Sequence, residues 1–129
     1  MSLLEIDHLA IAVHDLEASI ANWRDNFGLT LDRRARSEAL GIDQAYMAMP
    51  NGGFIELFTP MNEESPMAQV LAESGEGFKA MTMAVDDVEA TIAELTEKGV
   101  RTFKQGETTV LHAKSSTGLI ISLMNMQND

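Results

Sequence analysis

Apolar residues along this chain change their spacing in the same way at two places. Between residues 6 and 13 they alternate with smaller or more polar residues, which is typical of a half-covered strand. After residue 15 they follow one helical stripe, made of Leu16, Ile20, Trp23 and Phe27. After residue 87 a second such stripe comprises Val88, Ile92 and Leu95. Each place therefore predicts a strand that runs directly into an amphipathic helix.

The two strand-helix segments are copies of each other. Residues 12–21 and 84–93 align without a gap at an offset of 72, and seven of the ten positions are identical. The full copies extend over residues 6–28 and 78–99. Helix composition alone does not produce so regular a register, so we interpret the pattern as an internal duplication.

The rest of each copy predicts the same order of elements. In the first copy, further strands are predicted at 29–36, 44–49 and 54–58, with a hairpin turn at Pro50-Asn51-Gly52-Gly53. The second copy has a helix at 87–98 and further strands at 100–104, 108–113 and 119–126. We therefore predict an α+β fold of two tandem βαβββ modules, residues 1–58 and 78–129, whose sheets curve around a shared cleft. Residues 59–77 are predicted to be a linker with a short helix at 67–73.

Capping residues are predicted at both ends of the two main helices. Asp86 and Glu89 have the spacing of a capping box, which places the start of the second helix after Asp86. His14 takes the equivalent position in the first copy and is expected to cap that helix. Gly28 and Gly99 follow the helical stripes, where C-terminal caps are expected.

Composition and charge narrow the class of protein. The 129 residues are 45% apolar and 22% charged, as in soluble globular domains. The formal net charge of −11 argues against a nucleic-acid partner, because such binding depends on clustered lysine and arginine. No apolar run is long enough for a bilayer-spanning helix and there is no cysteine, so we predict a cytoplasmic protein with no membrane partner.

One basic cluster stands out in this acidic chain. Arg33, Arg34 and Arg36 fall on a predicted strand, where alternation puts Arg34 and Arg36 on one face and Arg33 on the other. The cluster can be a solvated strand edge. Alternatively, Arg34 and Arg36 contact an anionic ligand.

The repeat also pairs polar positions between the two copies. Glu56 corresponds to Ser122, and His8 corresponds to Ala80. In a pseudo-symmetric fold these four positions are predicted to converge on the cleft. A carboxylate on an otherwise apolar strand is costly to bury unless it is paired, so Glu56 is the strongest single candidate for a site residue.

Several short motifs resemble a known superfamily. They are residues 6–13 (IDHLAIAV), 55–60 (IELFTP), 75–78 (GEGF), 85–87 (VDD), 98–101 (KGVR) and 111–115 (LHAKS). With these motifs the chain resembles the vicinal oxygen chelate superfamily, which includes glyoxalase I, extradiol dioxygenases, antibiotic-resistance proteins and methylmalonyl-CoA epimerases. The resemblance is greatest to the epimerases and covers nearly the whole chain.

The resemblance implies a divalent metal held by two side chains from each module. His8 and Glu56 stand at the first-module ligand positions. The second module departs from the pattern, because Ala80 replaces a histidine and Ser122 replaces a glutamate. The catalytic base expected on the third strand falls near Ala45 or Tyr46, and neither can serve, so the catalytic residues are not identified.

Other positions are expected to contact a ligand rather than a metal. Ser122 and Ala80 line the predicted cleft, and His112 and Lys114 are expected to border its opening. For His8 there is an alternative to ligation, a hydrogen bond to Glu56 with no metal. We therefore predict either no tightly bound cofactor or a weakly bound divalent metal ion.

Two functions of different class fit these observations. The first is an isomerase or lyase of the epimerase type that acts on a small acid or thioester with His8 and Glu56 as its remaining site groups. The second is a metal-free binding protein of the bleomycin-resistance type, whose acidic charge would attract a cationic small molecule. Members of this superfamily commonly pair their modules between chains, so the resemblance also implies a homodimer.

Overall fold

The computed structural model describes residues 3–105, 108–116 and 118–126. Its helices are α1 (Leu16–Asp25), α2 (Pro66–Ser74) and α3 (Val88–Glu97), with a short 3-10 turn at Ala113–Ser116. Its strands are β1 (Leu3–Ala12), β2 (Thr30–Ser37), β3 (Ile42–Ala48), β4 (Phe54–Pro60), β5 (Gly77–Val85), β6 (Thr102–Gln105), β7 (Thr108–Leu111) and β8 (Ile121–Asn125). The predicted α+β class and the order βαβββ, repeated twice with the helix α2 between the copies, are confirmed. None of the helices in this part of the chain has the length and apolar character that a membrane crossing requires.

The strands form a mixed eight-stranded sheet in the order β2-β3-β4-β1-β5-β8-β7-β6. By its contacts the chain divides into two compact units, residues 9–79 and residues 1–8 with 80–129. These units differ from the sequence repeats, because the first residues of β1 group with the second half of the chain. The repeat boundaries at residues 58 and 78 stay a prediction.

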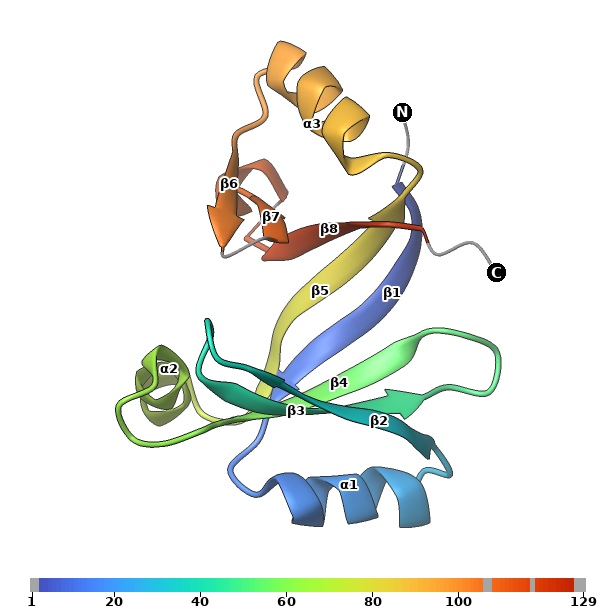
Figure 1. Ribbon diagram of the computed structural model, residues 1–129, viewed down its shortest axis with the longest axis vertical. Helices are drawn as coiled ribbons and strands as arrows, with labels where there is room; N and C mark the ends of the chain where they lie inside the picture. The colour runs from blue at the N-terminus through green and yellow to red at the C-terminus, as the bar shows by residue number, and fades with distance from the viewer. Residues whose placement is uncertain (1–2, 106–107, 117, 127–129) are drawn as a thin grey trace. The chain divides into compact units, whose positions relative to one another are not determined.

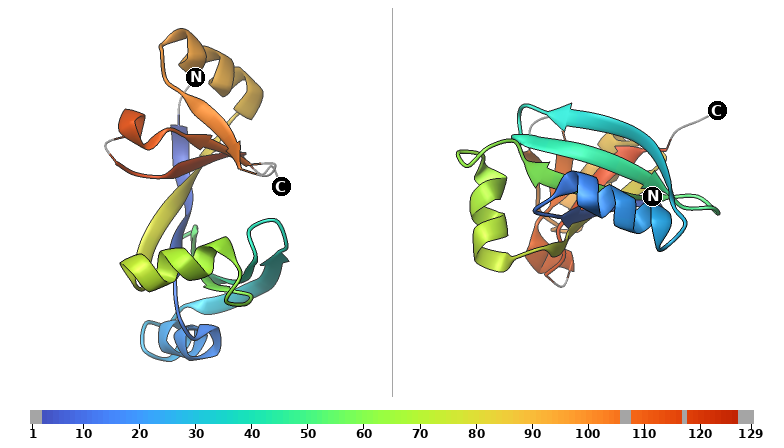
Figure 2. Two further views of the ribbon diagram at one scale, coloured as in Figure 1. Left: turned by 90° about the vertical axis from the view of Figure 1, so that its left-hand side faces the viewer. Right: turned by 90° about the horizontal axis from the view of Figure 1, so that it is seen from below.

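In the unit formed by residues 9–79, α1 packs on one face of the β2–β4 layer (Figures 1 and 2). The strands β3 and β4 are antiparallel, with Ala45 opposite Leu57 and Met47 opposite Ile55. These four side chains point at α1 and are buried with Val13, Ile20 and Leu29. The alternate side chains of both strands consequently point to the opposite face, and α2 covers only its end near Phe58 through Leu71 and Met67.

In the other unit, α3 packs on the sheet made by β5, β7 and β8. Strand β5 pairs in parallel with β8, and β8 pairs antiparallel with β7. The apolar side chains on the α3 side of this sheet form a second core, made of Val85, Leu111, Ile121 and Leu123 with Met81, Met83, Val88 and Leu95. The side chains that alternate with them on β5 and β8, including Ser122, point away from α3.

Both main helices begin one residue later than predicted. The N-caps are Asp15 and Asp87, whose carboxylates accept hydrogen bonds from the backbone N–H groups of Ala18 and Ala90. The predicted Asp86 capping box and the predicted His14 cap are therefore wrong. The physical reason is that Asp15 and Asp87 have the extended backbone that a capping residue needs, and each lies three residues before the N–H group that its carboxylate accepts from. Asp15 and Asp87 are equivalent in the repeat, so the correction preserves the duplication.

The helix C-caps are Asn26 and Lys98, one or two residues before the glycines predicted there, and several strand boundaries differ from the prediction. Gly28 and Gly99 have φ of 76° and 83° and follow α1 and α3. The last turn of α3 is closed by hydrogen bonds from Gly99 N to Thr96 O and from Val100 N to Leu95 O, a Schellman arrangement. Strand β7 ends at Leu111 instead of residue 113, because the chain turns into the 3-10 segment there.

Replacing Gly41 by alanine is expected to destabilise the protein by about 1–3 kcal/mol. Gly41 has φ of +66°, and an added Cβ would lie 2.8 Å from Oγ of Ser65, the residue that caps α2. Chemical denaturation would measure the loss. Gly52→Ala is the matched control, because Gly52 also has a positive φ of 103° but no heavy atom lies within 4 Å of its added Cβ. Equal losses for the two variants would contradict the proposed clash with Ser65.

Candidate functional site

Glu56 lies on the face of the β2–β4 layer opposite α1. On β3 and β4 the register places Tyr46 opposite Glu56, and both point away from the core that Met47 and Ile55 form with α1. Glu56 is buried, with 6% of its surface exposed. The buried carboxylate predicted from the sequence therefore exists, on a strand whose neighbours are apolar.

A hydrogen-bonded cluster holds this carboxylate. The side-chain amide of Gln44 donates to Oε2 of Glu56 at 3.0 Å, and its nitrogen lies 3.3 Å from the hydroxyl oxygen of Tyr46. Burying a carboxylate without donors costs several kcal/mol, so Gln44 offsets part of that cost. The cluster joins two adjacent strands and fixes the orientation of the Glu56 carboxylate on this face.

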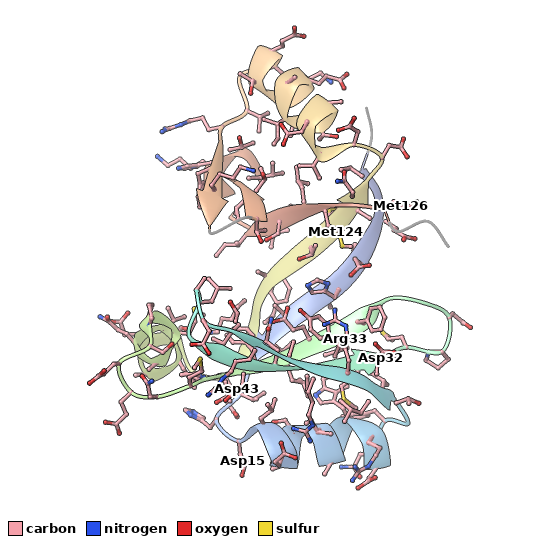
Figure 3. The ribbon with its side chains drawn as sticks, viewed as in Figure 1. Asp15, Asp32, Arg33, Asp43, Met124 and Met126 are labelled. Atoms are coloured by element: carbon pink, nitrogen blue, oxygen red, sulfur yellow. The ribbon has the colours of Figure 1, made fainter. Side chains whose placement is uncertain are left out.

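Arg33 joins the cluster from β2. Its guanidinium carbon lies 3.8 Å from the centroid of the Tyr46 ring, a cation–π stack, and the Phe54 ring meets Tyr46 edge-on with centroids 6.3 Å apart. Figure 3 shows Arg33 on the side of the sheet away from α1. The candidate site of this unit therefore contains a carboxylate, an amide, two aromatic rings and a guanidinium.

The other two arginines of β2 have carboxylate partners. Arg34 donates to both oxygens of Glu17 on α1 at 2.6 and 2.7 Å, and Arg36 lies 3.0 Å from Asp43 on β3. The hydrogen bonds from Arg34 hold the pKa of the Glu17 carboxyl below its ordinary value and raise the pKa of Arg34. The predicted split of faces is confirmed, but Arg33 and not Arg34 or Arg36 is the arginine on the Glu56 face.

His8 lies near the middle of β1 and is largely covered, with 14% of its side chain exposed. Its Nδ1 is 2.8 Å from Oδ2 of the neighbouring Asp7, so a carboxylate orients the imidazole ring. A histidine oriented in this way can donate, accept or ligate through Nε2. The structure thus gives His8 a defined orientation, and its predicted convergence with Glu56, Ala80 and Ser122 stays a prediction.

Ala80 and Ser122 lie on the face of their sheet opposite α3. Ser122 is directly opposite Thr82 in the β5–β8 register, and Ala80 is two residues before Thr82 on the same face of β5. Met124 is two residues after Ser122 and shares that face of β8 (Figure 3). This face consequently presents the small side chain of Ala80, the hydroxyls of Thr82 and Ser122, and a flexible thioether.

His112 and Lys114 flank the start of the 3-10 turn after β7. The backbone N–H of His112 donates to the carbonyl of Arg101, and the ring Nδ1 of His112 accepts from the backbone N–H of Lys114 at 3.3 Å. Lys114 is exposed. The contacts give His112 a structural role in this turn, and the predicted ligand contacts of both residues stay predictions.

The donor chemistry of the four repeat-related positions does not fit a catalytic divalent metal. His8 and Glu56 carry competent donors, Ala80 carries none and Ser122 offers only a hydroxyl. Catalytic metal sites generally have three protein ligands. Among residues 3–105, 108–116 and 118–126, no group of three or more histidine, aspartate or glutamate side chains is arranged to hold a metal ion.

Sequence reasoning missed Gln44, Arg33 and Phe54 as site residues. Alternation from Glu56 through the hairpin at residues 50–53 could have placed Tyr46 opposite Glu56 and Gln44 on the same face. The expected base position fell near Ala45 or Tyr46. Ala45 is buried against α1, whereas Tyr46 is on the site face. The sequence contains no signal for the side of the sheet on which Arg33 lies.

A separate pocket of about 440 Å3 lies at the other end of the residue 9–79 unit. It is lined by His14, Thr59 and Leu71, among others, between the start of α1, the end of β4 and α2. The backbone N–H of His14 donates to Glu76 at 2.7 Å, and the hydroxyl of Thr59 donates to the carbonyl of His14. These bonds connect the start of α1 to the segments on either side of α2, which gives His14 a structural role in place of the predicted cap.

Comparison with known proteins gives a consistent picture. Residues 7–115 match the family described as the Glyoxalase/Bleomycin resistance protein/Dioxygenase superfamily. An ethylmalonyl-CoA/methylmalonyl-CoA epimerase of Cereibacter sphaeroides is 30% identical over 128 residues, covering 92% of this chain and 95% of that protein. The mitochondrial methylmalonyl-CoA epimerase of Homo sapiens is 25% identical over 131 residues, covering 95% of this chain and 74% of that protein.

Solved structures agree with these matches. The methylmalonyl-CoA epimerase of Mycobacterium tuberculosis superposes with a TM-score of 0.88 at 27% identity, covering 98% of this chain and 90% of that one. A Streptomyces coelicolor methylmalonyl-CoA epimerase variant in complex with 2-nitronate-propionyl-CoA has a TM-score of 0.85 at 31% identity, covering 98% of this chain and 100% of that one. The fold and the family resemblance expected from the sequence are thereby confirmed.

Proposed function

Because the chain belongs to the Glyoxalase/Bleomycin resistance protein/Dioxygenase superfamily, we propose that it binds a small carboxylic acid or its coenzyme A thioester on the sheet face that carries Glu56. The observation that carries this proposal is the cluster of Glu56, Gln44, Tyr46 and Arg33 on one face of β2–β4. Polar groups held on a sheet face among apolar strands are typical of a ligand site. Similar solved structures include complexes with methylmalonyl-CoA and 2-nitronate-propionyl-CoA.

The donor chemistry of the repeat-related positions favours binding over rapid turnover. Proton removal next to a thioester carbonyl develops negative charge on the carbonyl oxygen, and a fast enzyme stabilises that charge with a strong electrophile. Ala80 offers no such group and Ser122 offers only a hydroxyl. We therefore propose an epimerase-type scaffold that binds thioesters and exchanges their α-proton slowly.

Methylmalonyl-CoA is expected to bind this protein with one ligand per chain, and chelation of metal ions is expected to leave its affinity unchanged. The reason is that no tight metal site is needed for contacts with Gln44, Tyr46 and Arg33. Calorimetry with and without EDTA would measure the affinity. Amide NMR shifts would locate the ligand, and they should change on β3 and β4 and stay constant in α1.

Experiments on the same samples distinguish an enzyme from a protein that only binds its ligand. Deuterium incorporation at the α-carbon of bound methylmalonyl-CoA in heavy water would report slow proton exchange, and its complete absence would assign a binding role alone. Failure of methylmalonyl-CoA, propionyl-CoA and free methylmalonate to bind would contradict the proposal.

A second candidate function is metal-free binding of a cationic small molecule. Two observations favour it, the formal net charge of −11 and the small side chains of Ala80 and Ser122 on the face of β5 and β8 opposite α3. Titration with a cationic antibiotic of the bleomycin class would test it. Saturable binding that weakens with added salt, together with no thioester binding, would favour this function. The homodimeric state and the cytoplasmic location stay predictions.

A further inference from the structure

A β-bulge decides which arginine of β2 reaches the Glu56 face. The register with β3 pairs Leu31 with Met47 but Arg33 with Tyr46, so one extra residue, Asp32, is inserted between them. Leu31 packs into the core under α1. In a regular strand Arg33 would share the face of Leu31, because side chains two apart point the same way. The bulge instead turns Arg33 to the opposite face, over the Tyr46 ring.

The stacked arrangement presents the guanidinium of Arg33 for a further contact. Stacking uses the flat face of the guanidinium, and its five N–H donors lie in the plane, available at the edge. The carboxylate of the adjacent Asp32 has its Oδ2 3.9 Å from Nε of Arg33, too far for a hydrogen bond. The side chain of Arg33 is 57% exposed, whereas the Tyr46 beneath it is buried.

Arg33 therefore differs from the other two arginines on its strand. Arg34 and Arg36 are engaged by Glu17 and Asp43 at 2.6 and 3.0 Å, on the face that α1 covers. Arg33 has its ring contact on one side and an exposed edge on the other. In a chain of net charge −11, an anionic ligand needs a local positive group to offset the general repulsion.

We propose that Arg33, stacked on Tyr46, determines the specificity of the Glu56 face for anionic ligands by donating to a carboxylate or phosphate of the ligand. This inference rests on the proposed function and adds to it the chemical class of the ligand. The anionic group has two possible sources, the free carboxylate of a dicarboxylic acid thioester or the phosphates of coenzyme A. Planar bidentate donation from arginine suits both.

Arg33→Gln is expected to weaken binding of methylmalonyl-CoA by about 10- to 100-fold, the range for losing a hydrogen bond to a charged group. Arg33→Lys is expected to recover only part of the loss, because lysine retains the charge without the planar fork. Arg34→Gln is the matched control, since it removes the same charge from the adjacent residue on the opposite face. Calorimetry of all four proteins at two salt concentrations would measure these effects.

Two further ligands identify the source of the anion. Propionyl-CoA has the phosphates but lacks the free carboxylate, and the methylmalonyl thioester of pantetheine has the carboxylate but lacks the phosphates. A loss for Arg33→Gln that appears with the pantetheine thioester and not with propionyl-CoA assigns the contact to the carboxylate. The reverse pattern assigns it to a phosphate.

The outcomes separate this inference from the proposed function. If the unmodified protein binds thioesters and Arg33→Gln binds them equally well, the role of Arg33 is overturned and the proposed function stands. If the unmodified protein binds no thioester, the proposed function fails. In that case, NMR of the Arg33 Nε–H group, titrated with methylmalonate and with inorganic phosphate, tests by itself whether Arg33 contacts anions. A saturable shift that Arg34→Gln leaves intact supports the anion contact, and no shift overturns it.

Discussion

The double variant Ala80→His with Ser122→Glu is expected to bind zinc, cobalt or manganese at micromolar or lower concentration, whereas the unmodified protein is expected to bind them weakly. The change supplies the imidazole and carboxylate that the superfamily resemblance places at these positions. Loss of a single outer-sphere partner costs about 10- to 100-fold in metal affinity, so two additional ligands are expected to raise affinity by at least about 1,000-fold. Calorimetry with each metal, in a buffer that does not chelate, would measure the difference.

The single variants are the controls for this experiment. Ala80→His alone provides three competent donors and should give an intermediate affinity, whereas Ser122→Glu alone tests the other added ligand. Tight stoichiometric binding by the unmodified protein would contradict the expectation and favour a metal-dependent enzyme. No binding by the double variant would show that the four positions do not converge as the repeat predicts.

Leu57→Ala is expected to lower the free energy of unfolding by about 3 kcal/mol, a large fraction of the stability of a domain of this size. Leu57 has 0% of its surface exposed and packs with Ala45, Met47 and Ile20 under α1. Replacing its isobutyl side chain by a methyl group loses apolar burial and leaves a cavity that the paired strands cannot easily close. Denaturant unfolding followed by circular dichroism would measure the loss.

Two matched variants show whether the loss at Leu57 comes from packing. Leu57→Met conserves volume and is expected to cost less than about 1.5 kcal/mol. Val70→Ala removes apolar atoms from a side chain on α2 that is 37% exposed and should change stability by no more than about 0.5 kcal/mol. A loss below 1 kcal/mol for Leu57→Ala would contradict the assignment of Leu57 to the core.

The fold could be predicted from the sequence for those features that depend on local sequence patterns. The repeat at residues 12–21 and 84–93 specified the order of elements, because hydrophobic period and glycine position are local properties. The helix starts were displaced by one residue, from Asp86 to Asp87, because both aspartates have suitable side chains. The backbone conformation, which decides between them, depends on how the preceding strand leaves the sheet.

From the sequence alone, one member of the candidate site could be singled out. Glu56 was identified because a carboxylate on an apolar strand needs a partner. Its partner Gln44 was not identified, because that hydrogen bond depends on the β3–β4 register. The contacts of His112 in its turn, likewise, come from backbone groups that no side-chain pattern indicates.

By itself, the sequence determined the duplicated βαβββ order and the family resemblance. It also determined that Ala80 and Ser122 lack the strong metal ligands that the resemblance expects at their positions. Only the tertiary structure decided which side chains share the Glu56 face. The bulge at Asp32 moves Arg33 from the α1 face to the Tyr46 face and leaves Arg34 with Glu17. The physical reason is that strand side chains alternate with a period of two, so one inserted residue reverses the face of everything after it, and the pairing strand rather than the local sequence fixes where that residue is inserted.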